Sequence, residues 1–376
     1  MRRFVKVITA ILVVISVLGI VSAQRYSYPK THELQQRINY LSRIIKKPLN
    51  RESEIIKIGY QNPEWMLFSL SFTTYALTNI SYLDSSFREQ AVETIDCAIR
   101  KTLTDTIYRP FFREDNPFAN NAIDSMGSVL YFGHLNLMLG CYRLLSENEK
   151  YNDLNDSLSV SLFKRYYNSG CLTLQSYPGM IWIPDNTVAL ASLYLHSMNT
   201  GSQYSKLTKD WVNYAKRHFL VSKNKLLCST IDVIDCEAHE APRGSMIGWS
   251  IFFIYRFDKE FAESQYEGYK ENFSSNLLVT RLYKERYKNR TTGTGDIDSG
   301  PLLFGYSIPA NAFAFACAVA LNDLRNAKRS QRLISLGSKK NYENYEITIQ
   351  TRFVDLNFSP LAEALLLYFE TMTEWK

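Results

Sequence analysis

The chain has 376 residues, of which 46% are hydrophobic and 14% are aromatic. An apolar fraction of this size allows a large buried core, and helical toroids and α/β barrels of this length form a single unit. The formal net charge is +6, but three of the positive charges lie in the first six residues. The other basic residues, including mild clusters at 284–290 and 328–340, are interpreted as solvated surface, so nothing indicates nucleic-acid binding.

The N-terminus has the pattern of an export signal. A short basic stretch, residues 1–6, precedes an apolar run over residues 7–23 that ends in small residues. This pattern predicts a secretory signal peptide, and the alternative is an uncleaved anchor within residues 5–23, because the run is near the lower limit for spanning a bilayer. Either interpretation predicts a periplasmic or extracellular protein with one domain over residues 24–376, which meets the membrane only through the N-terminal segment if that segment is uncleaved.

Helical spacing of apolar residues recurs along the rest of the chain. It predicts helices over residues 31–46, 64–78, 85–103, 121–146, 151–169, 186–198, 205–219, 245–257, 259–273, 307–327, 329–336 and 360–369. Between them we expect loops at 108–117, 170–185 and 291–306, whereas residues 220–243 alternate in the way that a pair of strands does.

Short and long connections alternate between these helices, as a closed ring of αα-hairpins requires. The predicted fold is therefore all-α: an (α/α)6 toroid of helical hairpins with a small β-hairpin insertion. Its inner helices should be the most uniformly apolar, as residues 188–194 and 310–320 are. An irregular helical bundle or solenoid is the alternative.

The six cysteines fall into two groups. Cys228 and Cys236 flank a strand-like stretch and could form a disulfide across a hairpin, or one of them could serve as a nucleophile. The others lie in apolar or helix-like surroundings and are predicted to be small buried hydrophobic residues: Cys97, Cys141, Cys171 and Cys317.

The loop at residues 291–301 is the first candidate site. Asp296 and Asp298 lie among glycines at 293, 295 and 300, which let a backbone approach a ligand closely. These carboxylates precede an apolar helix and are candidate acid and base groups. The alternative is structural: Asp298 or Ser299 caps the helix, and Asp296 closes an Asx turn.

A second loop, residues 177–186, holds a similar position before another apolar helix. In a ring of hairpins both loops would face one pocket, so Asp185 could complement Asp296 or Asp298 in general acid/base catalysis, unless it only caps its helix. Tyr177 and Trp182 could form a platform for a sugar ring or a lipid chain, or pack as a lid. Asn186 is a further candidate for substrate binding.

Four further side chains outside these loops, and one at the end of the first loop, are candidates for substrate binding. His239, Glu240 and Arg243 could hold an anionic group, or could form a surface ion-pair network. His134 lies in an apolar helix and is a binding candidate or a core histidine, and Tyr306 ends the loop of Asp298. We expect no metal and no cofactor, because no histidines show ligand spacing and no phosphate-binding loop is present.

The helix-pair rhythm and these two loops, residues 177–186 and 295–301, resemble exported bacterial proteins with an (α/α)6 toroid. That group includes six-hairpin glycosidases, the glucuronyl epimerase C-terminal domain and linalool dehydratase/isomerase-like proteins. The resemblance to the glycosidases implies that a carboxylic acid protonates the leaving oxygen while a carboxylate activates water. In the linalool group paired cysteines act on a small alcohol, and this chain has no cysteine next to Asp185 or Asp298.

The sequence therefore predicts an exported carbohydrate-active enzyme, a hydrolase, lyase or epimerase, acting on a small molecule or glycan. The alternatives are a non-catalytic envelope protein that binds glycans or a partner, and a dehydratase/isomerase of a small alcohol. An enzyme requires two carboxyl groups that converge on a pocket, whereas a binding protein requires only aromatic rings and hydrogen-bond donors there.

Overall fold

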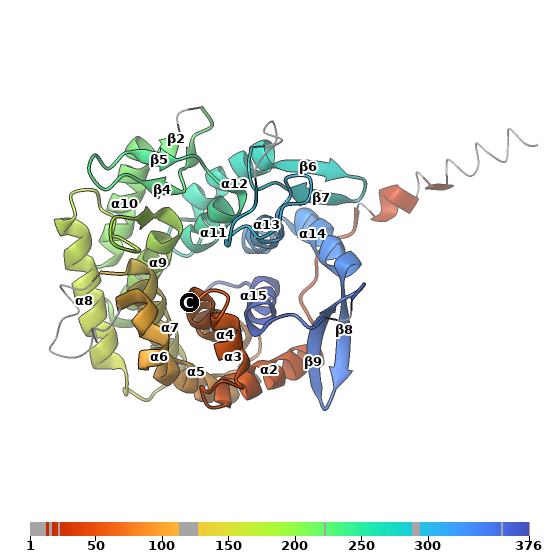
Figure 1. The fold of residues 1–376 in the computed structure, drawn as a ribbon, viewed down its shortest axis with the longest axis horizontal. Helices are drawn as coiled ribbons and strands as arrows, with labels where there is room; N and C mark the ends of the chain where they lie inside the picture. Colours follow the sequence, from red (N-terminus) through yellow and green to blue (C-terminus); the bar gives the residue numbers. More distant parts are fainter. Residues whose placement is uncertain are drawn as a thin grey trace, which may run out of the picture.

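The computed structural model describes residues 13–14, 17–21, 23–112, 127–221, 223–287, 294–354 and 356–375. Most of the predicted signal segment, part of the loop predicted at 108–117, the start of the helix predicted at 121–146, and Gly293 lie outside these ranges. The described chain forms a closed double ring of helices with small antiparallel hairpins at its edge (Figure 1). No described helix combines the length and the apolar character needed to cross a bilayer.

Six helices of the described chain make the inner ring: α4 (Glu64–Leu83), α7 (Val129–Leu145), α9 (Ile183–Thr200), α11 (Gly244–Ile254), α13 (Ile308–Ala320) and α15 (Pro360–Glu370). Each packs against the next, and α15 packs against α4, which closes the ring. These helices have neighbours on most sides and are apolar around their circumference. Helix α7, for example, buries 15 of its 17 residues.

The outer ring consists of α2 (Thr31–Lys46), α5 (Arg88–Thr102), α8 (Asn152–Asn168), α10 (Ser205–His218), α12 (Lys259–Phe273) and α14 (Leu324–Gly337). Each inner helix up to α13 forms a hairpin with the outer helix that follows it along the chain, as α4 does with α5, and the first outer helix, α2, packs against the last inner helix, α15 (Figure 1). The inner helices therefore run in the same direction, and their N-termini meet at one end of the barrel. This is the predicted (α/α)6 toroid.

Helices α7 and α9 make the closest pair in the ring. Their approach depends on Gly133, because a β-carbon there would lie only 3.0 Å from the backbone nitrogen of Ala189. That spacing is tighter than most β-carbon contacts, so a larger residue would force the two helices apart slightly, and glycine suits this crossing.

Several predicted boundaries are wrong by a few residues, as at the end of α4 and the starts of α9 and α14, and two errors change a connection. The loop predicted from residue 108 is helical up to Phe112, in α6 (Asp105–Phe112), because its aromatic face packs on Tyr131 of α7 despite Pro110. The helix predicted for 307–327 ends at Ala320. Asn322 has a positive φ of 58°, and Asp323 then caps α14, so the chain turns between two helices. A short helix that the sequence did not indicate, α3 (Glu54–Gly59), precedes α4.

The strand-like stretch forms two small sheets. Strands β1 (Ile181–Trp182), β4 (Thr230–Ile231) and β5 (Ala238–Glu240) pair in that order, and β2 (Leu220–Val221) pairs with β3 (Leu226–Leu227). Two further hairpins were not anticipated: β6 (Ser274–Leu277) with β7 (Thr280–Tyr283), and β8 (Ser338–Glu343) with β9 (Glu346–Thr351). They extend the connections after α12 and α14.

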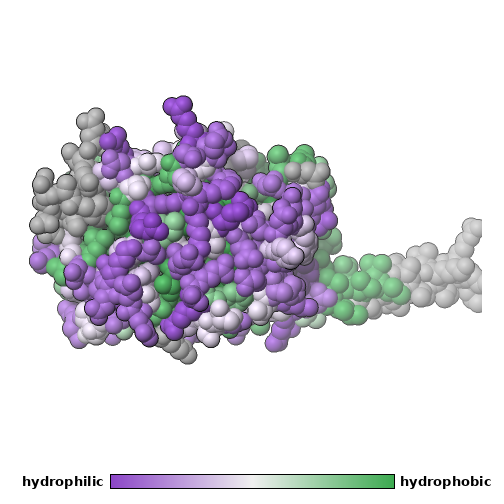
Figure 2. Space-filling view, turned by 90° about the horizontal axis from the view of Figure 1, so that it is seen from below, coloured by the Kyte–Doolittle hydropathy of each residue, from purple (hydrophilic) through white to green (hydrophobic). Residues whose placement is uncertain are grey.

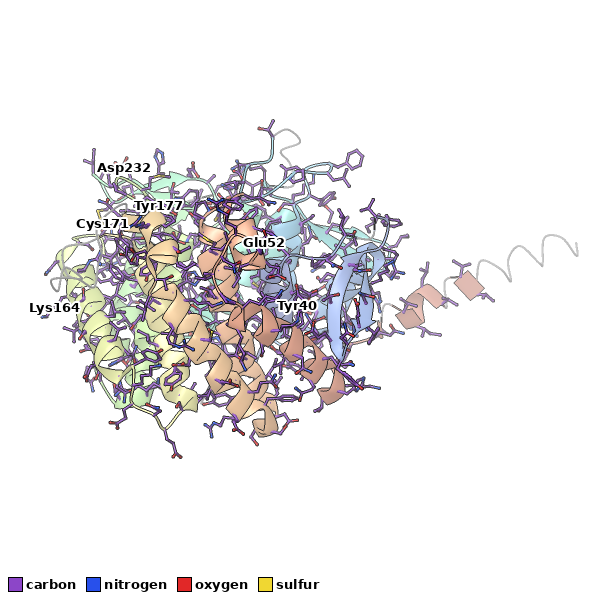
Figure 3. The ribbon with its side chains drawn as sticks, turned by 60° about the horizontal axis from the view of Figure 1, so that its bottom comes forward. Tyr40, Glu52, Lys164, Cys171, Tyr177 and Asp232 are labelled. Carbon is purple, nitrogen blue, oxygen red and sulfur yellow. A yellow bond between two sulfur atoms is a disulfide. The ribbon has the colours of Figure 1, made fainter. Side chains whose placement is uncertain are left out.

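The possible disulfide between Cys228 and Cys236 is not formed. Cys236 bonds to Cys171, 65 residues earlier, and their Cα atoms are 5.6 Å apart. The pairing of β1 with β4 brings these two connections together, whereas Cys228 points into the core. Cys171 is therefore not a free buried residue as predicted, although Cys97, Cys141 and Cys317 are. Figure 3 places Cys171, Tyr177 and Asp232 at the same end of the barrel.

The C-terminal tail covers the opposite end of the inner barrel. The indole nitrogen of Trp375 donates to Asn79 Oδ1 at 2.8 Å, and the Arg256 guanidinium stacks over the Trp375 ring at 3.7 Å. Arg256 also donates to the carbonyl of Thr373 at 2.6 Å. The tail is thus held to α4 and α11 at their C-terminal ends, and the other end of the barrel is the one that holds the site.

Candidate active site

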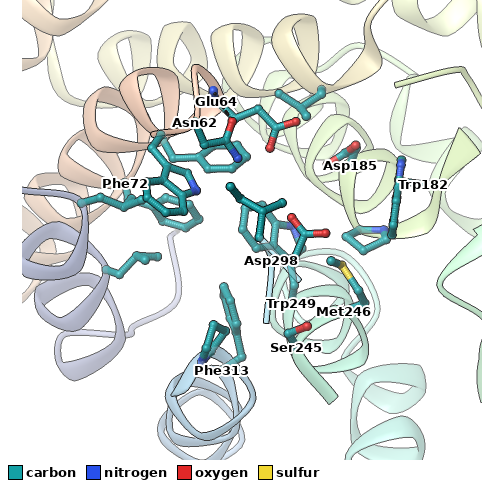
Figure 4. Close-up of a pocket in the computed structure, with 18 of the residues that line it drawn as sticks. Asn62, Glu64, Phe72, Trp182, Asp185, Ser245, Met246, Trp249, Asp298 and Phe313 are labelled. Carbon is teal, nitrogen blue, oxygen red and sulfur yellow. Dashed lines mark hydrogen bonds between the residues drawn. The ribbon is translucent and has the colours of Figure 1, made fainter. Parts of the chain in front are cut away.

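A cavity of about 520 Å³ lies at the N-terminal end of the inner helices. All six inner helices contribute to its wall from within their first three residues: Glu64, Leu130, Asp185, Ser245, Pro309 and Leu361. The loop that follows residue 294 contributes Ile297, Asp298 and Gly300. The toroid therefore gathers side chains from across the sequence into one pocket, shown in Figure 4.

The wall of this cavity is strongly aromatic: Trp65, Phe68, Phe72, Tyr177, Trp182, Trp249 and Phe313. Phe68 and Phe72 each pack against Trp249, with ring centroids 5.3 Å apart in both pairs. Tyr177 and Trp182, the two aromatic residues predicted from the second loop, both lie in the wall. Flat apolar faces with polar groups between them suit a ring-shaped polar ligand.

Asp185 projects from the third position of α9 into the cavity. The start of α9 has no side-chain cap, and Asp185 lines the cavity although only 7% of its surface is exposed. Burial raises the pKa of Asp185 to about 8; the nearby Glu64 and Asp298 add to this rise, and the Ser176 hydroxyl opposes it. Asp185 is therefore mainly protonated at neutral pH.

Asp298 reaches the same cavity from the loop between β7 and α13. Burial raises its pKa to about 6, assisted by the negative charges of Glu64, Asp296 and Glu285, while the Arg243 guanidinium works against the rise. Asp298 is therefore mainly ionised at neutral pH. The cavity thus holds one protonated and one ionised carboxyl group, which could serve as a proton donor and a proton acceptor.

Glu64 is a third carboxyl group of the cavity, and the sequence did not indicate it. It is the first residue of α4, and its carboxylate accepts a hydrogen bond from the Tyr177 hydroxyl. The backbone amide of Glu64 donates to Asn62 Oδ1 at 3.0 Å. Burial raises the pKa of Glu64 as well. Acidic residues are common at the start of a helix, where they complement the helix dipole. The sequence around Glu64 therefore does not show that its side chain faces the cavity, and only the ring topology does.

Arg243 does not line the cavity but organises the loop that does. It is buried, and its Nε donates to the buried Glu285 at 3.0 Å, while its Nη2 donates to Asp296 at 2.7 Å. Its Nη1 lies 3.7 Å from Asp298. Glu285 also accepts from the Ser245 hydroxyl at 2.7 Å, which fixes the start of α11. Arg243 is thus committed to carboxylates of the protein, and we assign it a positioning role rather than substrate binding.

Asp296 does not line the cavity. Its carboxylate accepts from the Ser299 amide at 2.9 Å, and its own amide donates to the Ser299 hydroxyl at 2.9 Å, so it closes a turn as the structural interpretation predicted. Burial tends to raise the pKa of Asp296, but the Ser299 amide and the Arg243 guanidinium outweigh it and hold that pKa below its ordinary value. The other half of that interpretation is wrong, because Ser307 caps α13, not Asp298 or Ser299.

Asn186 is buried beside the cavity and is used within the fold. Its side-chain amide donates to the carbonyls of Leu174 and Trp182, at 3.0 and 2.8 Å, and its oxygen accepts from the Leu174 amide at 2.8 Å. The Tyr166 hydroxyl donates to the same oxygen at 2.9 Å. Asn186 therefore braces the loop before α9.

The remaining candidates lie outside the cavity. His134 is fully buried behind the wall, between Phe68 and Tyr75, and burial lowers its pKa to about 3. His239 and Glu240 are exposed on β5. Tyr306 pairs with Leu303 and lies under the Lys284 ammonium, 5.6 Å from its ring centroid.

The described residues contain no group of three histidine, cysteine or acidic side chains arranged to hold a metal ion. None of the four free cysteines is among the described residues that line the cavity. The chemistry that this wall offers comes from its carboxyl groups and aromatic rings.

No protein-family model matches the sequence. The fold, however, is similar to that of an unsaturated glucuronyl hydrolase specific for heparin, with 11% identity, a TM-score of 0.56, and coverage of 90% of this chain and 95% of the other. It is also similar to an inactive variant of the α-1,6-mannanase of Salegentibacter sp. HEL1_6 in complex with alpha-1,6-mannotetrose, with 12% identity, a TM-score of 0.53, and coverage of 91% and 99%.

A D-mannose isomerase matches at 11% identity and a TM-score of 0.52, with coverage of 81% of this chain and 87% of the other. Identities this low show the fold and not the reaction. These structures are (α/α)6 toroids of the six-hairpin glycosidase type, which confirms the fold class predicted from the sequence. The chain is an (α/α)6 toroid with a cavity at the N-terminal end of its inner barrel.

Proposed function

We propose that this protein is a carbohydrate-active enzyme that hydrolyses a glycosidic bond by general acid/base chemistry in the cavity. The observation that carries the proposal is the separation of the pKa values of Asp185 and Asp298, about 8 and about 6, in one aromatic-lined pocket. Near pH 7 the first group holds a proton to give and the second is free to accept one.

In the proposed reaction the protonated Asp185 gives its proton to the glycosidic oxygen as the bond from that oxygen to the anomeric carbon breaks. The ionised Asp298 removes a proton from a water molecule, whose oxygen then bonds to the anomeric carbon. Trp182 and Trp249, on the wall, stack against the sugar faces. Glu64 holds Tyr177 in place and keeps the local potential negative.

The proposed substrate is a neutral glycan. The ionised Asp298 lines the cavity together with Glu64, and the negative potential of this acidic wall disfavours a uronate or sulfate group beside it. The similar folds belong to a hydrolase specific for heparin, an α-1,6-mannanase and a D-mannose isomerase, which supports a carbohydrate substrate without selecting one. The pocket chemistry favours mannan-like over heparin-like substrates.

The test is release of reducing sugar from neutral oligosaccharides, including α-1,6-mannan, beside heparin fragments. Asp185→Asn and Asp298→Asn should each lower kcat by about 100-fold or more while the melting temperature shows an intact fold. The matched control is Glu240→Gln, which removes an exposed carboxylate away from the cavity. Full activity in either aspartate variant would refute the proposed roles. Tight glycan binding without turnover of any neutral glycan would favour the non-catalytic alternative.

We further infer that the protein acts outside the cytoplasm. The N-terminal pattern predicts export, and the Cys171–Cys236 disulfide suits an oxidising compartment. Fusion of the first 30 residues to a reporter enzyme that is active only after export tests this inference. An inactive reporter, with the fusion protein present at normal amounts, would contradict it.

A further inference from the structure

One edge of the ring differs from the rest of the outer layer. Helix α14 buries only Ala327 and Ser330 of its 14 residues. Residues 324–340 carry six basic side chains and no acidic one: Arg325, Lys328, Arg329, Arg332, Lys339 and Lys340. Four of them are on α14, and Lys339 and Lys340 are on β8, where Lys340 pairs with Glu33. A peripheral helix with four basic and no acidic residues has the composition of a surface that meets anionic groups.

Exposed apolar residues surround this helix, and we call them the apolar collar: Leu277, Leu278, Leu336, Phe353, Val354 and Leu356. Each is more than half exposed, from 55% for Leu277 to 84% for Phe353. Clusters of exposed apolar side chains on a soluble surface usually mark an interaction site.

The tip of the β6–β7 hairpin shows that the exposure of the collar is not incidental. The turn between Leu277 and Thr280 has two residues, and Leu278 adopts a positive φ of 50° there. Such turns favour asparagine and glycine, and a leucine in this conformation is strained. This leucine is 80% exposed, so neither its conformation nor its side chain contributes to the core.

The collar is held around the point where the N-terminal segment joins the ring. The Arg332 guanidinium donates to the carbonyl of Val279 at 3.1 Å, to Gln24 Oε1 at 3.0 Å, and to the carbonyl of Val21. Arg352 donates to the carbonyls of Ser335 and Ser338, at 2.8 and 2.9 Å, which holds the segment of Phe353 against the end of α14. The described part of the apolar N-terminal segment, residues 17–21, projects from this edge (Figures 1 and 2).

We propose that the apolar collar and the basic face of α14 rest on the surface of an anionic phospholipid bilayer, and that the N-terminal apolar segment enters the same bilayer beside them. Basic side chains meet the headgroups, while leucine and phenylalanine side chains enter the acyl boundary. The basic cluster at 328–340 is then a membrane contact rather than only a solvated face. Because the collar is at the rim of the ring, the barrel axis lies along the membrane and the cavity stays open to a glycan.

The experiment uses the full chain in vesicles of phosphatidylcholine with and without phosphatidylglycerol. An environment-sensitive fluorophore is attached to a cysteine introduced by Leu278→Cys or Phe353→Cys, with Ile234→Cys as a matched site, which is 90% exposed on a different edge. Brominated lipids in the same vesicles quench fluorophores that reach the acyl region. The two collar sites should be quenched about twofold or more, and the Ile234 site should not be.

A second variant tests the electrostatic part. The double substitution Arg325→Glu and Lys328→Glu should reduce quenching at the collar in phosphatidylglycerol vesicles and leave it unchanged in pure phosphatidylcholine. Collar quenching no greater than at Ile234 would overturn the proposal, and so would quenching that is indifferent to anionic lipid and to both charge reversals. Hydrolysis can be assayed in detergent, so this outcome is independent of the proposed function.

Discussion

Arg243 Nη1 lies 3.7 Å from a carboxylate oxygen of Asp298, and the same guanidinium is bound to Glu285 and Asp296. A cation this close holds the pKa of Asp298 lower than burial alone would set it. The cation is in turn fixed by Glu285, which is 1% exposed. The ionisation of a cavity carboxylate is therefore controlled by an ion pair outside the cavity.

Replacing Arg243 should shift the acidic limb of the pH–rate profile to higher pH, because Asp298 then needs a higher pH to ionise. Arg243→Gln also leaves the buried Glu285 without its positively charged partner, at a cost on the order of 3–5 kcal/mol. The double variant Arg243→Gln/Glu285→Gln should recover most of that stability and retain only part of the shift, because loss of the Glu285 charge lowers the pKa of Asp298. Glu285→Gln alone should move the limb the other way, and an unmoved limb in all three variants would exclude this coupling.

The activity should follow a bell-shaped pH profile with limbs near 6 and 8, set by the ionisation of Asp298 and the deprotonation of Asp185. Asp185 and Asp298 interact electrostatically, so the two apparent pKa values of the profile describe the pair and not either residue alone. Glu64 raises the pKa of both aspartates, and Glu64→Gln should move both limbs to lower pH. The measurement is kcat/KM against pH for both proteins, and movement of only one limb would contradict the arrangement.

Asp185→Asn should stabilise the protein at alkaline pH. The folded-state pKa of Asp185, about 8, is above its ordinary value of 3.8, so folding loses stability as the pH rises between these values. Asparagine cannot ionise, so the variant escapes this loss. Between about pH 5 and about pH 8.5, the unfolding free energy of the variant relative to the parent should rise by an amount on the order of 3–5 kcal/mol. Thermal melts at both pH values measure it.

Asp296→Asn is the control for that experiment, because its effect on stability should change with pH in the opposite direction. The pKa of Asp296 is held below its ordinary value, so its contribution to stability is present above that value and is lost as the pH falls. The asparagine variant should be less stable than the parent at neutral pH, and the difference should shrink in acid. Equal pH dependence in the two variants would contradict both assignments.

Loss of the Cys171–Cys236 disulfide should lower stability and weaken substrate binding. The bond closes a loop of 65 residues, for which chain entropy predicts a stabilisation of about 4 kcal/mol. The same loop carries Tyr177 and Trp182, so KM should rise more than kcat falls. Reductant should lower the melting temperature of the parent but not of the Cys171→Ser/Cys236→Ser variant. A reductant-sensitive variant would point to another bond.

The sequence predicts the ring because its helices are long and periodic, and each periodicity is local information. It also places Asp185 and Asp298 in one pocket, since each lies at or before the start of an inner helix of a ring. The sequence does not identify Glu64 and Glu285 as buried site residues, because their neighbours in sequence look like those of exposed acidic residues at the ends of helices and strands. The disulfide partner of Cys236 depends on the pairing of β1 with β4, which is set by the tertiary fold and not by the spacing of cysteines.

The ring closes through residues at opposite ends of the described chain. The Tyr26 hydroxyl donates to the carbonyl of Glu370 at 2.7 Å, and that of Tyr28 to the carbonyl of Met372 at 2.9 Å, each across 344 residues. Contacts this distant in sequence form late in folding. A chain still emerging from the ribosome or a translocon therefore has an open barrel with uncovered apolar helices, which is the state most exposed to aggregation and proteolysis. Truncation before α15 would leave the molecule permanently in that state.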